Sequence, residues 1–132
     1  MKTYVLDSSA LMTFFENRVG ADEVEKILVD AADAERPLAM SVVNWGEVCY
    51  SVWRAHGEKT ATLKLHEIAQ LPIQVFDVDT ELAKLAASLK AQYNLPYADC
   101  FAAALAQSRK ATLVTADKDF ECVEPLLKIA WV

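Results

Sequence analysis

The sequence predicts an α/β fold of three layers, α/β/α, around a mainly parallel central sheet. Short apolar runs of strand length alternate along the chain with longer segments whose apolar residues recur at helical spacing. Only three glycines and four prolines interrupt the 132 residues, and no linker or repeat divides them. With 54% apolar and 24% charged residues, the composition suits one soluble globular domain with a proper core.

The first three elements follow from apolar spacing and from one proline. Residues 3–6 form a short apolar run that is typical of a strand, and Leu11 with the phenylalanines after it marks a short helix. Residues 21–34 repeat apolar side chains at helical spacing behind an acidic first turn, which favours a helix. Pro37 ends this helix, so the second strand covers residues 38–41.

The remaining elements continue the alternation. Their expected positions are helices at 43–56 and 59–70, a strand at 73–76, helices at about 82–93 and at 97–109, and strands at 112–115 and 128–131. Strands that alternate with helices are joined by crossover connections. Such connections make neighbouring strands parallel and place helices on both faces of the sheet.

Four acidic residues stand where expected strands end or expected helices begin. They are Asp7 after the first strand, Glu47 in the first turns of helix 43–56, Asp99 at the start of helix 97–109, and Asp117 after the strand at 112–115. The carboxyl ends of parallel strands gather at one edge of the sheet, where such folds bind ligands. Carboxylates that converge there repel one another unless cations neutralise them. The pattern therefore predicts a divalent-metal site.

The charge balance limits how this protein could bind a nucleic acid. The formal net charge is −6, from 13 basic and 19 acidic residues, which argues against a grip through a broad basic surface. Without the four carboxylates the balance is 13 against 15, or −2, so bound metal would offset much of the excess. Weak RNA binding is compatible with this charge but is not supported by it.

Cysteine usage and hydropathy indicate a cytoplasmic protein. Cys49, Cys100 and Cys122 are odd in number and lack C-x-x-C spacing, so reduced and mostly buried thiols are expected. No apolar run approaches the length that spans a membrane, and the first strand begins within three residues of the start. We therefore expect neither a membrane segment nor a cleaved signal peptide.

Four motifs make the pattern more specific. They read TYVLDSSALMTFF from residue 3, NWGE at 44–47, YADCFAAALA at 97–106 and LVTADKDF at 113–120. In this order and spacing they resemble the motifs of the PIN-domain nucleases, and among these most of all the VapC-type toxins of toxin–antitoxin pairs. The resemblance covers essentially the full length and implies a single PIN-like nuclease domain over residues 1–132.

The resemblance also implies the residues of the site. The family's four acidic positions fall on Asp7, Glu47, Asp99 and Asp117, and the supporting polar residues are expected at Thr115, Ser9 and Asn44. We expect Asp7 and Asp99 to be the principal metal ligands. Asp117 and Glu47 are expected to complete the shell directly or through water.

The chemistry of RNA cleavage explains why such a site needs carboxylates. Mg²⁺, with Mn²⁺ as its substitute, prefers oxygen ligands and keeps several waters. One or two such ions can activate a water, neutralise a non-bridging phosphate oxygen and stabilise the leaving oxygen. No histidine is then needed as a base, and His56 and His66 lie outside all four motifs.

Each carboxylate also has a structural interpretation. Asp7 could N-cap the first helix, Glu47 could be a solvated helix residue, Asp99 could stabilise a helix N-terminus, and Asp117 could belong to an Asx turn. Taken singly these roles are the more common ones, whereas four carboxylates at one sheet edge favour the functional role. If the chain curls into a turn after Asp117, Asp119 is expected to point away from the metal, where it caps the turn or pairs with a lysine; the alternative is that both carboxylates serve the site.

Three classes of function compete. The leading hypothesis is a metal-dependent endoribonuclease that cleaves RNA as a homodimeric toxin and is silenced by a cognate antitoxin protein. An acidic-pocket phosphohydrolase or aspartyl-phosphate receiver is disfavoured because Ser8 and Ser9, rather than a D-x-D pair, follow Asp7. A non-enzymatic PIN-like binding module would have lost some of the acidic positions, and here all four are present.

Overall fold

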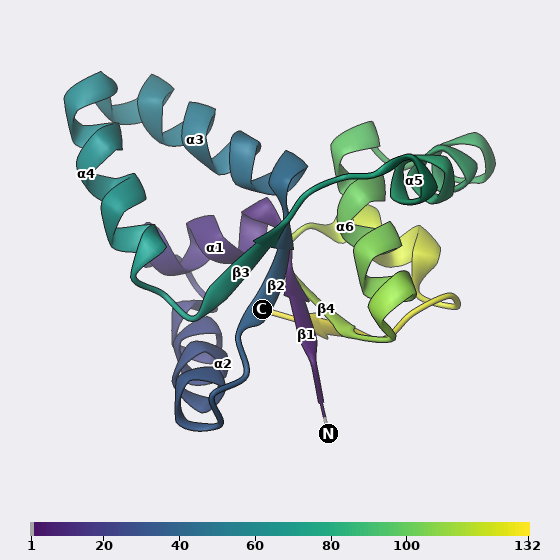
Figure 1. Ribbon diagram of the computed structural model, residues 1–132, viewed down its shortest axis with the longest axis horizontal. Helices are drawn as coiled ribbons and strands as arrows, with labels where there is room; N and C mark the ends of the chain where they lie inside the picture. Colours follow the sequence, from purple (N-terminus) through teal and green to yellow (C-terminus); the bar gives the residue numbers. More distant parts are fainter. Residues whose placement is uncertain (1) are drawn as a thin grey trace.

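The computed structural model describes residues 2–132 and contains a five-stranded sheet in the order β3-β2-β1-β4-β5 (Figure 1). The strands are β1 (Tyr4–Leu6), β2 (Leu38–Ser41), β3 (Ile73–Phe76), β4 (Thr112–Thr115) and β5 (Ile129–Trp131). Every neighbouring pair is parallel, and Val5 in the central strand lies between Ala39 and Leu113. The predicted α/β class with a parallel sheet is confirmed.

Six α-helices connect these strands within residues 2–132. They are α1 (Ser8–Phe15), α2 (Ala21–Asp33), α3 (Val42–His56), α4 (Glu58–Ala69), α5 (Thr80–Gln92) and α6 (Tyr97–Arg109). The side chains of Asp7, Ser41 and Asp79 accept backbone N–H hydrogen bonds at the starts of α1, α3 and α5, which fixes where these helices begin. A 3-10 helix, η1 (Lys118–Val123), follows β4 where the sequence predicts only a turn.

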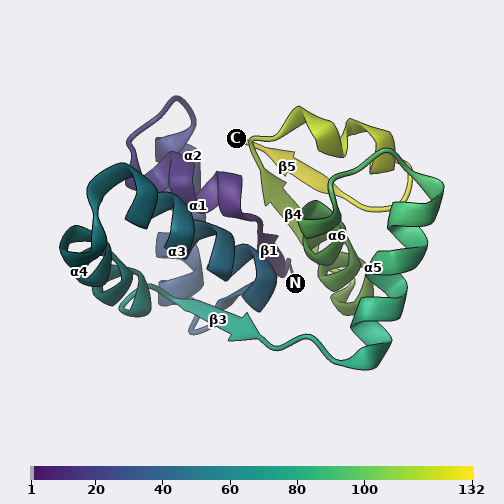
Figure 2. The ribbon, with the colours of Figure 1, turned by 90° about the horizontal axis from the view of Figure 1, so that it is seen from above.

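The pleat of the sheet divides the core into two layers. In the central strand Val5 packs with the α5 and α6 side, whereas Leu6 packs with the α1 to α4 side. Leu113 and Val114 of β4 alternate in the same way. Figures 1 and 2 show the result, with α1 to α4 on one face of the sheet and α5 and α6 on the other.

The thiols are only partly as expected. Cys100 is buried and Cys49 half-buried, but Cys122 is exposed on η1, so the expectation of mostly buried thiols is wrong for this residue. The three thiols are free. None of the helices between residues 2 and 132 has the length and apolar character needed to cross a membrane.

Candidate metal centre

The strand order determines where a ligand would bind. From β1 the chain proceeds outward to β2 and β3, and then returns through α5 and α6 to β4 on the other side of β1. The order reverses between β1 and β4, and open α/β sheets bind ligands at the carboxyl ends of the strands that flank such a reversal. Asp7 directly follows β1, and Asp117 lies two residues beyond the end of β4. Two of the predicted acidic residues therefore flank this point.

Asp7 is buried at the start of α1 and is held by hydrogen bonds on both carboxylate oxygens. Its Oδ1 accepts from the Ala10 backbone N–H at 2.8 Å, and its Oδ2 accepts from the Thr115 hydroxyl at 2.6 Å. The Ser9 hydroxyl lies 2.8 Å from each oxygen. Burial raises the pKa of Asp7 to about 6, against the lowering effect of these hydrogen bonds, and the charge of Asp117 adds to the increase.

Ser9 and Thr115 connect α1 to the end of β4. Ser9 Oγ accepts from the Ala116 backbone N–H at 3.0 Å and lies 3.1 Å from Thr115 Oγ1. Thr115 Oγ1 accepts from the Asp117 backbone N–H at 2.9 Å. The two hydroxyls therefore fix Asp7 relative to the backbone that carries Asp117.

Asp99 is a buried carboxylate for which the described residues supply no side-chain hydrogen bond. It lies in the first turn of α6, is 7% exposed, and its Oδ2 is buried without a hydrogen-bond partner. The pKa of Asp99 is raised to about 7, mainly by burial and then by the charges of Asp117, Asp7, Glu47 and Asp119, in that order. A buried, unpartnered carboxylate oxygen in a residue that feels the charges of four other carboxylates would be stabilised by a cation.

Glu47 lies at the margin of this group. Its Oε1 accepts from the Ser8 hydroxyl at 3.1 Å and from Asn44 Nδ2 at 3.0 Å. Asn44 is fully buried and also donates to the Ala98 carbonyl at 3.1 Å, so it ties the start of α3 to the start of α6. Asn44 therefore contacts Glu47 directly, and its supporting role stays a prediction. The contact of Ser8 with Glu47, 39 residues away, has no counterpart in the sequence pattern.

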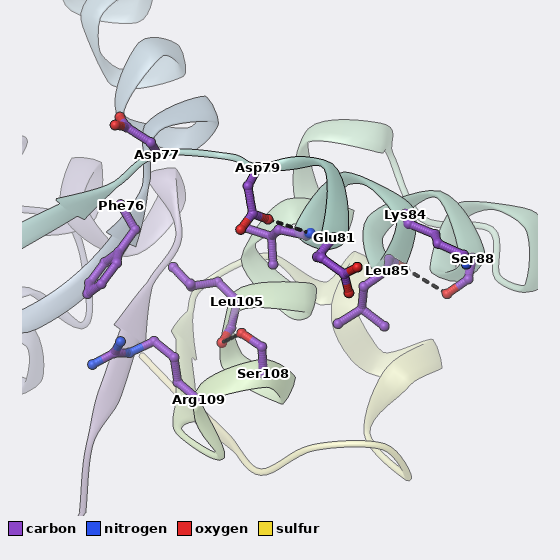
Figure 3. Close-up of a pocket in the computed structure, with 11 residues that line it drawn as sticks. Phe76, Asp77, Asp79, Glu81, Lys84, Leu85, Ser88, Leu105, Ser108 and Arg109 are labelled. Carbon is purple, nitrogen blue, oxygen red and sulfur yellow. Dashed lines mark hydrogen bonds between the residues drawn. The ribbon is translucent and has the colours of Figure 1, made fainter.

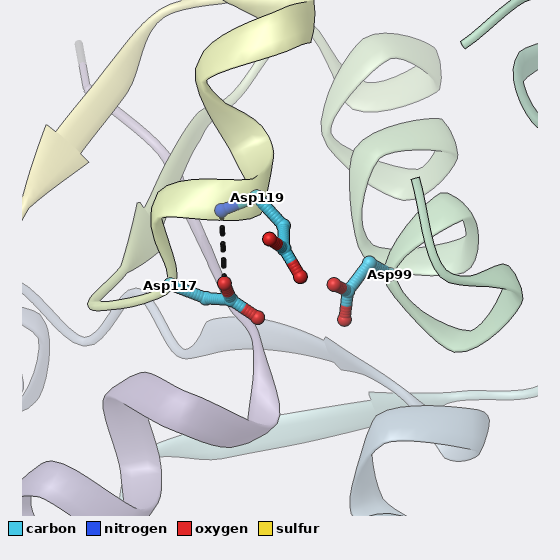
Figure 4. A group of neighbouring side chains, drawn as sticks. All are labelled: Asp99, Asp117 and Asp119. Carbon is cyan, nitrogen blue, oxygen red and sulfur yellow. Dashed lines mark hydrogen bonds between the residues drawn. The ribbon is translucent and has the colours of Figure 1, made fainter. Parts of the chain in front are cut away.

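The closest carboxylates are those of Asp99, Asp117 and Asp119 (Figure 4). One oxygen from each lies within 4.8 Å of the others, and Figure 4 shows the Asp119 carboxylate directed toward Asp99. The expectation that Asp119 points away from the site is therefore wrong. Asp117 is the residue that caps η1, because its Oδ1 accepts a hydrogen bond from the Asp119 backbone N–H at 2.9 Å. The turn formed in this way directs the Asp119 side chain toward α6.

This donor set fits a hard divalent cation. All the available atoms are carboxylate oxygens, which Mg²⁺ and Mn²⁺ prefer. The one ion pair that the structure records between residues 2 and 132 joins Arg18 to Glu16, so the described residues supply no counter-charge to the cluster. Asp7 and Glu47 stand outside the close group of three, and their role as ligands stays a prediction.

A hollow of about 680 Å³, separate from the acidic cluster, lies between α5, α6 and the end of β3 (Figure 3). Several of its polar groups already have partners within the fold. Asp79 accepts from the Leu82 backbone N–H at 2.8 Å, Ser88 donates to the Leu85 carbonyl at 2.8 Å, and the Arg109 guanidinium packs 4.3 Å from the centre of the Phe76 ring. The acidic cluster, with its unpartnered buried oxygen, is therefore the stronger candidate for chemistry.

The chain matches the family model of the PIN domain over residues 4–124. It belongs to the PIN-domain family. The matched range contains all five acidic residues of the site and confirms the resemblance stated from the four motifs. No curated protein sequence matches the chain.

Solved structures with the same fold include toxin–antitoxin proteins of low sequence identity. VapBC2 from Rickettsia felis, bound to a DNA fragment from its promoter, has a TM-score of 0.77 at 19% identity over 97% of each chain. DNA-bound VapBC from Salmonella typhimurium has a TM-score of 0.73 at 20% identity over 98% of each chain. VapC20 from Mycobacterium tuberculosis, described as a sarcin–ricin loop cleaving toxin, has a TM-score of 0.69 at 15% identity, covering 90% of this PIN domain and 93% of that chain.

Proposed function

We propose that this PIN domain is a metal-dependent endoribonuclease that hydrolyses RNA phosphodiester bonds. Two observations carry the proposal. One oxygen from each of Asp99, Asp117 and Asp119 lies within 4.8 Å of the others, at the reversal of strand order, and the Oδ2 of Asp99 is buried without a hydrogen-bond partner. Such an arrangement is costly without a cation and becomes favourable with one. Membership of the PIN family supports a nuclease rather than another use of an acidic pocket.

The proposed cofactor is Mg²⁺, with Mn²⁺ as a substitute. Asp99, Asp117 and Asp119 would hold it most closely, with Asp7 and Glu47 contributing directly or through water. When bound, the ion supplies charge neutralisation for the phosphate and a water of lowered pKa as nucleophile.

The chain's own residues orient and organise this site. The hydroxyls of Ser9 and Thr115 keep Asp7 in one orientation, and Asn44 holds Glu47 beside the start of α6. Ligands fixed in this way lose little conformational freedom when the ion and the substrate bind, which favours catalysis. Because no basic side chain pairs with the cluster among the described residues, its attraction for RNA depends on the cation.

We further propose that the protein is the toxin of a toxin–antitoxin pair and acts as a homodimer. The likeness of its fold to VapBC proteins and to a VapC toxin described as cleaving the sarcin–ricin loop supports this role. An antitoxin could silence the site with an arginine or lysine, because a cation from the inhibitor would replace the metal ion among the carboxylates. Co-expression with the product of the neighbouring reading frame should give a stable, weakly active complex. Failure of the two proteins to co-elute at micromolar concentration would contradict the role as the toxin of a toxin–antitoxin pair.

A non-enzymatic PIN-like module is the alternative that an assay must exclude. Purified, partner-free protein should cleave total RNA with Mg²⁺ or Mn²⁺ and lose this activity in EDTA. Under the same conditions a phosphohydrolase would release phosphate from small phosphate esters and leave RNA intact. Intact RNA in every metal condition, with the protein still folded by circular dichroism, would overturn the nuclease assignment.

A further inference from the structure

A hollow of about 370 Å³ lies at the amino ends of the strands, at the opposite edge of the sheet from the acidic cluster. Three lysines line it, Lys2 before β1, Lys110 between α6 and β4, and Lys128 before β5, and no acidic side chain does. The start of β1 lies at the bottom of Figure 1, far from the start of α3 where the acidic site lies. In a chain of net charge −6, this gathering of positive charge is local and distinct.

The ammonium groups of these lysines have no recorded partner among the described residues. Across residues 2–132 the structure records neither an ion pair nor a side-chain hydrogen bond for Lys2, Lys110 or Lys128. The last carbonyls of α6 do not need them, because the backbone N–H groups of Lys110 and Ala111 donate to Gln107 and Ala106 at 3.2 and 2.9 Å. Three like charges around one hollow repel one another, and a bound anion would relieve this repulsion.

The backbone around the hollow is held firmly by the sheet. The Thr112 N–H donates to the Thr3 carbonyl and the Leu113 N–H to the Lys128 carbonyl, both at 2.9 Å. Lys110 adopts a left-handed conformation, with φ of 52°, as the C-cap of α6. The backbone at Lys110 and Lys128 is therefore held by the end of α6 and by β4, and Lys2 directly precedes the anchored Thr3, which limits the ordering cost of binding.

The other polar groups indicate what accompanies the negative charge. Thr3 and Thr112 line the same hollow, as does Gln107, whose Oε1 is buried without a hydrogen-bond partner. An unpartnered amide oxygen needs a donor, which a phosphate at neutral pH supplies poorly and a ribose hydroxyl supplies well.

We propose that this hollow binds the phosphate of a ribonucleotide, either free or within an RNA chain. Lys2, Lys110 and Lys128 surround the phosphate, and Gln107 accepts a hydrogen bond from a ribose hydroxyl. The volume is that of an ordinary small-molecule site. Binding is independent of the metal centre and of RNA cleavage, and it weakens as the salt concentration rises.

The test is a titration of the metal-free protein in EDTA, followed by amide NMR, with three separate probes: inorganic phosphate, a ribonucleoside 5′-monophosphate and a short single-stranded RNA. Amide signals of Thr3, Gln107 and Thr112 should shift with the ribonucleotide or the RNA. The probe that binds most tightly identifies the source of the phosphate. Replacing the ribose by deoxyribose should weaken binding, because the hydroxyl donor to Gln107 is lost.

Matched variants separate a built site from a general effect of charge. The double variant Lys110→Gln and Lys128→Gln should bind about tenfold or more weakly, a loss of about 1.4 kcal/mol. The control Lys26→Gln and Lys59→Gln removes the same charge from exposed positions on α2 and α4 and should bind as the wild type does. Equal losses in both double variants, or no shift of these amides with any probe, would overturn the proposal.

Discussion

Asp7 and Asp117 each cap a helix and also belong to the acidic site, so the two roles do not exclude one another. Asp7 caps α1 and Asp117 caps η1, which are the structural roles that each residue suggests when taken alone. The same caps orient the carboxylates at the carboxyl ends of β1 and β4. Asp99 differs, because its Oδ2 has no partner and nothing in the fold itself explains its burial.

The position of Asp119 changes what its substitution should do. Asp119→Asn removes a charge from the close group of three and leaves the cap of η1 intact, since that cap belongs to Asp117. We expect Asp119→Asn and Asp117→Asn each to weaken Mn²⁺ binding and to lower RNA cleavage by orders of magnitude. Calorimetric Mn²⁺ titration and a cleavage assay measure the two effects, and wild-type Mn²⁺ affinity in folded Asp119→Asn would exclude this residue from the site.

Thr115 offers a sharp test of the hydroxyl support. Thr115→Val keeps the shape but removes the donor to Asp7 and the acceptor for the Asp117 N–H, so stability should fall by about 1–3 kcal/mol. The pKa of Asp7 should rise, because the Thr115 hydrogen bond lowers it. Thr115→Ser, which retains the hydroxyl, is the matched control for urea unfolding and for NMR titration of Asp7. Equal stability of the two variants would mean that this hydroxyl does not hold the site together.

At the scale of elements, the sequence predicts what depends on regular spacing. The six helices are found because their apolar residues recur at a period of 3.6, and the five strands because they are short apolar runs. Each strand lies within one residue of its expected range. The 3-10 helix η1 is not predicted because its six residues form too few turns to show a repeating pattern of apolar side chains. The orientation of Asp119 depends on that helix, and so it could not be derived from the sequence.

Contacts between distant elements are the other part that the sequence does not predict. The four motifs identify the acidic residues, and the parallel order brings them to one edge. Which side chains then touch depends on helix rotation and packing. The Ser8 to Glu47 hydrogen bond and the Asn44 to Ala98 bridge are set in this way.

Replacement of two glycines by alanine should change the stability of the protein in opposite directions. Gly20 precedes α2 with φ of +100°, and a Cβ there would lie 2.6 Å from the Val132 carbonyl carbon, so Gly20→Ala should destabilise the protein by more than about 1 kcal/mol. Gly46 lies within α3, and a Cβ there would meet no atom within 4 Å, so Gly46→Ala should stabilise the protein by about 0.5–1 kcal/mol. Urea unfolding of both variants measures the difference, and a destabilised Gly46→Ala would contradict the packing described for α3.

At the scale of the whole molecule, the acidic edge makes the stability of the metal-free protein depend on pH. The pKa values of Asp7 and Asp99, about 6 and about 7, are raised from 3.8, so the folded state holds protons that the unfolded state has lost. The contribution of these groups is therefore fully present below about pH 4 and is lost as the pH rises through about 6–7. Asp99→Asn does not titrate, so its melting temperature in EDTA should exceed that of the wild type by a margin that grows with pH.

Added Mn²⁺ should reverse this dependence, because the ion binds the ionised carboxylates and stabilises the wild type more at pH 7 than at pH 5. Melting temperatures across this range, with and without Mn²⁺, measure both trends. If the difference in melting temperature between Asp99→Asn and the wild type in EDTA stays constant with pH, the ionised form of Asp99 does not destabilise the folded state.

The central claim is that the carboxylates around Asp99 bind the ion that drives RNA cleavage. The most direct test measures RNA cleavage and Mn²⁺ binding on the same partner-free protein, for the wild type, Asp99→Asn and the control Asp79→Asn, which alters only the cap of α5. We predict that cleavage by the wild type and by Asp79→Asn rises in parallel with Mn²⁺ occupancy and stops in EDTA, while folded Asp99→Asn has neither activity nor tight binding. Cleavage that persists in EDTA, or wild-type cleavage by Asp99→Asn, would contradict the account.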